Sequence, residues 1–399
     1  MVEFALYQPI ELHTNKQPSP RYSAYLLANQ GTARWADLGE AAPIDHAVEL
    51  WRQALRDPAH RDVTRLGRAV DEKLMQPLRT LLGPAKHLLV SPDGPLNLIP
   101  FAALVDEQGK YLVEAYTITY LTSGRDLLRL QVRRESKSAP VVVADPAFGE
   151  PALVASAVGR VAGNKGNANE RAQVDYSQIF FGPLPGVSDE VRALRELLPT
   201  ATFLTKEQAT KTALKHVSGP SVLHIATHGF FLADDRRGND ESNVKNTRLG
   251  KWVGQVESPL LRSGLALAGA NRAATGDDDG ILTALEVTGL DLWGTKLVVL
   301  SACDTGVGEV KNGDGVYGLR RALVLAGTES QLMSLWPVSD RSTRDLMIGY
   351  YKLLTKGQGR GEALRQVQLE MLKNKSHRHP YYWASFIQTG EWANLEGKR

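Results

Sequence analysis

Cysteine is almost absent from this sequence: Cys303 is the only one among 399 residues. A single thiol excludes an internal disulfide bridge and a zinc site built from several thiolates. The histidines are too scattered to add a ligand cluster, so we expect no metal and no cofactor. A free thiol is typical of a reducing compartment, which predicts a cytoplasmic location.

An excess of one charge is also missing. There are 47 Lys and Arg residues against 44 Asp and Glu residues, which leaves a net charge of +3. We therefore expect no direct nucleic-acid partner and no membrane partner. No apolar run is long enough to span a bilayer, and the first residues do not form a secretion signal. The chain begins in what reads as a strand, which predicts a fragment of a larger protein.

The first third of the chain predicts a smaller α+β domain. Short strands are expected over residues 4–38, a helical region over 44–82, and further strands over 86–90 and 113–121, by apolar spacing and turn signals. Residues 133–139 are polar and basic and predict a linker. The first predicted domain therefore covers residues 1–138.

From residue 139 onward, strand and helix patterns alternate, which is typical of a mostly parallel sheet with helices on both faces. The predicted second domain covers residues 139–399. Strands are expected over 141–144, 202–204, 222–227, 297–302, 330–336 and 383–388, and helices over 189–197, 209–216, 316–326, 342–355 and 360–373. In such an α/β sheet, the functional groups lie outside the carboxyl ends of the strands.

Two predicted strands end directly in reactive side chains. His228 follows the strand over 222–227, and Cys303 follows the strand over 297–302. A thiolate is a strong nucleophile, and a neighbouring imidazole can take up the thiol proton and later return it to the leaving amine. Gly229 allows close approach of a substrate, and its N–H can stabilise an oxyanion. The pair predicts a cysteine hydrolase.

A purely structural interpretation of the same residues is also open. Free cysteine is often a small buried hydrophobic residue, and His228 would then be a hydrogen-bonded core histidine. The occurrence of both groups at strand ends on one rim favours the catalytic interpretation. His224, earlier on the same strand, is predicted to be buried, hydrogen-bonded and structural.

Two other motifs do not fit the functions that they suggest. A cysteine phosphatase loop needs an arginine where this chain has Glu309, and an acidic side chain would repel phosphate. Residues 313–318 match the string GxGxxG, but the preceding strand ends well upstream of them, which argues against a dinucleotide site.

Two segments rich in Gly, Asn and charge interrupt the pattern, over residues 158–174 and 234–251, and both are predicted to be mobile surface loops. Basic residues in the second loop suggest sites of self-cleavage at Arg236, Arg237 or Arg248.

Several motifs, in order along the chain, carry a family resemblance. They are Ser91–Leu104, Val143–Phe148, Leu184–Gly186, His224–Gly229, Ser258–Leu265, Ser301–Gly306, Gly313–Leu319 and Ser334–Val338. This combination resembles the CHAT family of caspase-like cysteine peptidases, which are commonly found behind tetratricopeptide repeats. More distantly, it resembles caspases, separases and gingipains.

The resemblance implies a caspase-like α/β fold with His228 as general base and Cys303 as nucleophile. It implies an oxyanion hole from the backbone N–H groups of Gly229 and Cys303. By the same analogy, Trp336 and Pro337 flank the substrate, whose backbone adds to the sheet edge. Residues 1–138 would match the degenerate caspase-like half that some relatives contain.

Acidic side chains near the expected pocket are Asp145, Asp304 and Asp340. An acidic pocket would select Arg or Lys before the cleaved bond. The alternative is that these acids cap helices, as the position of Asp340 just before a predicted helix suggests.

The predicted function is that of a cysteine endopeptidase that cleaves a partner protein, activated by an upstream repeat domain or partner protein. Two alternatives stay open: a catalytically silent caspase-like scaffold for protein–protein interaction, and a cysteine transferase or other acyl hydrolase.

Overall fold

The computed structural model describes residues 1–10, 18–132, 134–150, 179–231, 260–272, 278–301, 314–337 and 340–399. Cys303, Asp304 and the whole of the two predicted loops, including all three suggested self-cleavage sites, lie outside these ranges. Within the described ranges, none of the helices combines the length and the apolar character needed to cross a bilayer.

The described residues form one 11-stranded sheet in the order β3-β2-β1-β4-β5-β14-β13-β12-β8-β6-β7. Neighbouring strands are parallel except at β1–β2, β2–β3 and β13–β14, which confirms the predicted mostly parallel sheet. The strands are β1 Val2–Tyr7, β2 Arg21–Leu26, β3 Arg34–Glu40, β4 His87–Ser91, β5 Thr117–Tyr120, β6 Val141–Pro146, β7 Thr202–Lys206, β8 Val222–Ala226, β12 Leu297–Leu300, β13 Ser330–Ser334 and β14 Phe386–Gly390.

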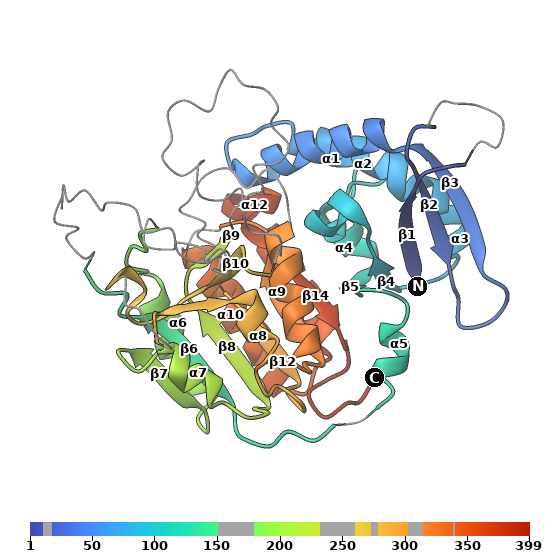
Figure 1. The fold of residues 1–399 in the computed structure, drawn as a ribbon. Coiled ribbons are helices and arrows are strands. Elements are labelled where there is room, and N and C mark those ends of the chain that lie inside the picture. The colour runs from blue at the N-terminus through green and yellow to red at the C-terminus, as the bar shows by residue number, and fades with distance from the viewer. Residues whose placement is uncertain are drawn as a thin grey trace, which may run out of the picture.

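The central strands bury both faces, as strands of a parallel sheet do. In β8, Val222 and Ala226 belong to one apolar core, whereas Leu223 and Ile225 belong to the other. The first core receives side chains from α6 (Val187–Leu197), α10 (Asp340–Thr355) and α11 (Arg360–Lys373). The second receives them from α7 (Lys211–Lys215), α8 (Ala284–Val287) and α9 (Asp314–Leu325). The prediction of helices on both faces is therefore confirmed (Figure 1).

Helices α1 (Ala41–Arg56) and α2 (Val63–Leu74) pack on the N-terminal strands. The predicted helical region over 44–82 is interrupted between them. Pro58 explains the break, because it has no N–H and disfavours helical geometry at the residue before it. The remaining short helices are α3 Arg79–Leu82, α4 Leu112–Ala115, α5 Asp126–Arg129 and α12 Pro380–Trp383, with 3-10 turns at Gln76–Leu78, Gly94–Leu98, Phe101–Ala103, Ala270–Arg272 and Lys375–His377.

Two predicted strands were wrong at their beginnings. The strand over 113–121 starts as helix α4, whose first turn is capped because Glu114 accepts a hydrogen bond from the Tyr111 N–H. The strand over 383–388 is shifted to Phe386–Gly390, behind α12. Here His379 caps the helix by accepting from the Tyr381 N–H, and Pro380 suits its first turn.

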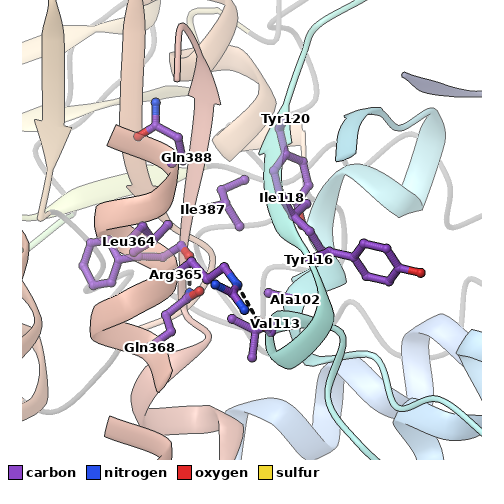
Figure 2. Close-up of a pocket in the computed structure, with 12 residues that line it drawn as sticks. Ala102, Val113, Tyr116, Ile118, Tyr120, Leu364, Arg365, Gln368, Ile387 and Gln388 are labelled. Carbon is purple, nitrogen blue, oxygen red and sulfur yellow. Dashed lines mark hydrogen bonds between the residues drawn. The ribbon is translucent and has the colours of Figure 1, made fainter. Parts of the chain in front are cut away.

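The sheet is continuous across the predicted domain boundary at residue 138. Strand β14 pairs in parallel with β5 through Thr389 and Tyr120. Figure 2 shows Arg365 of α11 reaching towards Val113, and its Nε donates to the Val113 carbonyl oxygen at 2.8 Å. In the predicted linker, the Arg134 guanidinium stacks 3.7 Å from the centre of the Trp293 ring. The division into residues 1–138 and 139–399 stays a prediction.

Candidate active site

His228 lies where the main sheet passes into a second, smaller sheet. Strand β8 ends at Ala226, and β9 (Gly229–Phe231) begins directly after His228. Strand β9 pairs antiparallel with β10 (Ser263–Ala266), which pairs with β11 (Ile281–Thr283). The Ala266 N–H donates to the His228 carbonyl oxygen at 2.9 Å. His228 therefore lies between β8 and β9, and its carbonyl oxygen is bound by β10. The sequence patterns did not predict this smaller sheet.

Two aromatic side chains pack against the His228 ring. Its exposed fraction is 5%, and its centre lies 5.2 Å from the Phe148 ring and 5.8 Å from the Phe181 ring. Both phenylalanines belong to a small apolar cluster with Ile179 and Phe230. This packing limits the orientations that the ring can adopt.

A main-chain oxygen determines which ring nitrogen of His228 carries the proton. Nε2 lies 2.7 Å from the carbonyl oxygen of Gly182. A carbonyl oxygen can only accept, so Nε2 must be the donor, and in the neutral ring the lone pair then belongs to Nδ1. When the ring becomes cationic, the same carbonyl dipole stabilises the charge. This arrangement suits a general base that acts through Nδ1.

Strands β8 and β12 end on the same rim of the sheet. They pair in parallel with Leu300 opposite Ile225, and the Ser301 N–H donates to the Ile225 carbonyl oxygen at 2.9 Å. Ser301 is the last described residue before Cys303. The described part of β12 thus runs towards the rim where His228 lies.

His224 has the structural role predicted for it. It is fully buried, with Nδ1 3.0 Å from the Tyr351 hydroxyl of α10 and Nε2 3.1 Å from a carboxylate oxygen of Glu190 in α6. Burial, and then the neighbouring Tyr350 and Glu190, raise the pKa of Tyr351 well above its usual value. The phenol therefore stays protonated and can donate to Nδ1. This network ties β8 to two helices beneath the candidate site.

Asp145, a predicted substrate-binding residue, already has a cationic partner. It stands near the end of β6 with a φ of 52°. Its Oδ2 lies 2.6 Å from Nζ of Lys206 and accepts a hydrogen bond from the Ser188 hydroxyl at 3.0 Å. A carboxylate with these partners has less capacity to bind a substrate cation. Its assignment to substrate binding stays a prediction.

The other predicted substrate-binding residues are only partly described. Trp336 has an exposed fraction of 4%, and its Nε1 donates to the Tyr381 carbonyl oxygen at 3.2 Å. Pro337 is exposed. Asp340 is the first residue of α10, and its side chain lies outside the described set, as does Asp304.

The structure adds two contributors that the sequence analysis did not name as site residues. Gly182 acts through its carbonyl oxygen, so no side chain could have pointed to it. Phe148 ends the motif Val143–Phe148, which carried the family resemblance, and this position was the only signal for it. The roles of Gly229 and Cys303 in an oxyanion hole stay predictions.

The family comparison agrees with the motifs. Residues 64–391 match the CHAT domain, so this chain belongs to the CHAT domain family. The family predicted from the sequence is therefore confirmed.

Among curated proteins, the chain is similar to human tetratricopeptide repeat protein 28, with 25% identity over 321 residues. The mouse protein of the same name is 23% identical over 338 residues. Each alignment covers 79% of this chain but only 12% of the relative. The chain thus spans a small part of the length of these relatives.

Among solved structures, the chain is similar to the Saccharomyces cerevisiae separase–securin complex, with 11% identity, a TM-score of 0.42, and coverage of 92% of this chain and 21% of that one. It is also similar to the Arg-specific cysteine proteinase gingipain R, with 10% identity, a TM-score of 0.41, and coverage of 88% and 74%.

Proposed function

We propose that this chain is a cysteine endopeptidase in which Cys303 is the nucleophile and His228 the general base. The observation that carries the proposal is the parallel register of β12 on β8, in which Leu300 pairs with Ile225. Cys303 follows Leu300 by three positions, as His228 follows Ile225. A register that continues to the rim brings the thiol and the imidazole together.

In the proposed reaction, Nδ1 of His228 takes the thiol proton and the thiolate attacks the scissile carbonyl carbon. The N–H groups of Gly229 and Cys303 receive the oxyanion of the tetrahedral intermediate. The intermediate collapses to a thioester as the imidazolium gives its proton to the leaving amine. His228 then deprotonates a water molecule, which attacks the thioester and releases the acid and the thiol.

The substrate is proposed to be a cytoplasmic partner protein, cut after a basic residue. Since Asp145 is paired with Lys206, Asp304 and Asp340 are the stronger candidates to bind that residue. A regulatory repeat domain or partner protein would control the activity, in line with the repeat proteins among the relatives. Residues 1–138 would form a pseudo-peptidase half, and residues 139–399 the peptidase domain.

The first prediction concerns the dyad itself. Incubated with a proteome, the wild-type protein is expected to produce new peptide ends, found by mass spectrometry of labelled N-termini. C303A and H228A should produce none, because each lacks one partner of the proton transfer. H216A, which removes an exposed histidine, is the matched control and should act like the wild type.

Labelling by iodoacetamide separates the peptidase from the silent scaffold. Because the chain has one cysteine, alkylation reports on Cys303 alone. A cysteine activated by His228 reacts quickly at pH 6, where an ordinary thiol with a pKa of about 8.5 reacts slowly. Equal rates for the wild type and H228A, without new peptide ends, would favour the scaffold.

A further inference from the structure

The inference concerns Asn271 and rests on the proposed function. Asn271 lies in the 3-10 turn Ala270–Arg272, between β10 and β11, and its exposed fraction is 8%. It belongs to none of the family motifs. Its interest lies in the four backbone groups that it binds.

The amide of Asn271 satisfies both main-chain groups of Phe181. Oδ1 accepts a hydrogen bond from the Phe181 N–H at 2.9 Å, and Nδ2 donates to the Phe181 carbonyl oxygen at 2.9 Å. This is the pairing that a neighbouring strand would provide. Residues 179–184 belong to no helix or strand. The Asn271 amide therefore provides the hydrogen bonds that a neighbouring strand would otherwise make with Phe181.

Asn271 also binds the segment that carries Phe148, the second phenylalanine beside the ring. Nδ2 donates to the Gly149 carbonyl oxygen at 2.9 Å, and the Asn271 N–H donates to the Phe148 carbonyl oxygen at 2.9 Å. Residues 147–150 likewise have no regular secondary structure. One residue therefore ties together two irregular segments that come from distant parts of the sequence.

These two segments carry groups that contact His228. Phe148 and Phe181 pack beside the ring and against each other. The residue after Phe181 is Gly182, whose carbonyl oxygen lies 2.7 Å from Nε2. A shift of the Phe181–Gly182 peptide would move that oxygen directly. The bonds of Asn271 therefore hold the residue next to the carbonyl oxygen that lies against the imidazole.

We propose that Asn271 is a positioning residue for His228, the general base of the proposed function, and acts through Phe181 and Gly182. It needs an amide, because the side chain accepts one hydrogen bond and donates two. Aspartate keeps the acceptor and the volume but loses both donors. Alanine loses all three bonds.

The alternative is that Asn271 is a buried amide with a purely structural role. Asn394 provides a matched control, because it is also buried and bonds to backbone groups: Nδ2 donates to the Gly357 carbonyl oxygen, and Oδ1 accepts from the N–H groups of Glu396 and Lys398. These partners lie at residues 357, 396 and 398, in a different part of the sequence from Phe148, Phe181 and His228.

The test is the pH profile of Cys303 alkylation by iodoacetamide, measured with the melting temperature for the wild type, H228A, N271A, N271D and N394A. The wild type should keep fast alkylation down to about pH 6, and H228A should lose it. In N271A and N271D, the imidazolium loses its aligned carbonyl partner. The fast range should then move to higher pH, and the rate at pH 6 should fall about tenfold or more.

The N394A control and the H228A variant distinguish failure of the Asn271 proposal from failure of the proposed function. N394A should lower the melting temperature and leave the pH profile where it is, because its bonds do not reach the dyad. N271D keeps the side-chain volume, so it still tests the proposal if N271A fails to fold. Wild-type profiles in both Asn271 variants, with loss in H228A, would overturn this inference alone. A wild-type profile in H228A would overturn the proposed function and this inference with it.

Discussion

The proton of His228 is assigned by a backbone oxygen, whereas the proton arrangement of His224 involves side chains. The Gly182 carbonyl cannot donate, so it requires a proton on Nε2. At His224, inside the core, the Tyr351 hydroxyl lies next to Nδ1 and a Glu190 carboxylate oxygen lies next to Nε2. The two histidines, four positions apart, therefore have different surroundings. His224 lies within strand β8, whereas His228 lies just beyond its end, at the rim of the sheet.

His87 gives a pH prediction at the same scale. Its Nε2 lies 3.0 Å from the Thr119 hydroxyl, and its ring packs edge-on against Trp392. Burial lowers the pKa of His87 below its ordinary value of 6.5. The folded state then binds fewer protons than the unfolded state, so stability should fall as the pH drops below about 6.5.

The measurement is the free energy of unfolding in urea at pH 7.5 and pH 5.5. The contribution of His87 to the loss is at most about 1.4 kcal/mol for each pH unit below 6.5. H87Q should show a smaller loss, because glutamine does not titrate. H46Q, which changes an exposed histidine, should behave like the wild type. An equal loss in H87Q would show that His87 is not the titrating group.

At the scale of elements, the small sheet β11-β10-β9 positions the backbone of His228 and Gly229. Its middle strand contains Gly264, opposite Phe230 and Thr283. A Cβ at Gly264 would lie 2.6 Å from the Leu282 carbonyl oxygen and 2.7 Å from the Phe230 ring. These distances leave no room for a methyl group, so glycine is needed for the close approach of the strands.

G264A should therefore destabilise the fold by about 1–3 kcal/mol, as overpacked core substitutions do. Because β9 begins at Gly229, the displaced strand should also slow the alkylation of Cys303 at pH 6. Both effects are checked by thermal melting and by the labelling rate.

G289A is the control for this substitution. Its Cβ would meet its nearest neighbour, the Glu286 carbonyl oxygen, at the ordinary distance of 3.4 Å. It should leave both the melting temperature and the labelling rate close to wild type. A G264A protein as stable as G289A would contradict the packing argument.

At the scale of the whole molecule, one sheet and one large apolar core run across residue 138. The core contains Phe101 and Tyr120 from one side of the boundary and Leu364 and Phe386 from the other. Figure 1 shows the N-terminal strands continuing the same sheet beyond β14. Because apolar side chains from both parts bury one another, we expect the two parts to unfold together.

Calorimetry of the full chain should therefore show one cooperative transition. A chain of residues 139–399 alone should aggregate or fail to melt cooperatively, because removal of β5 exposes the β14 edge and the apolar side of α11. Co-expression of residues 1–138 as a separate chain is the control and should restore a soluble complex. A well-folded 139–399 fragment would instead establish two independent domains.

Local patterns in the sequence were sufficient for much of the fold. The apolar runs at β6, β8 and β12 are bounded by turn signals, so they predict buried strands without knowledge of their neighbours. The errors over 113–121 and 383–388 arose where Glu114 and His379 cap short helices, since a cap depends on side-chain geometry that apolar spacing does not reveal.

The sequence by itself determined the family, the mostly parallel sheet, and the position of His228 just beyond a strand, because these follow from the order of motifs and from local apolar periodicity. Only the tertiary structure placed the Gly182 carbonyl oxygen at the imidazole and the Asn271 amide on the main chain of Phe181. These contacts join segments far apart in the chain through backbone groups, which every residue possesses. Which residues make these contacts therefore depends on how the chain folds, and residue type does not reveal it.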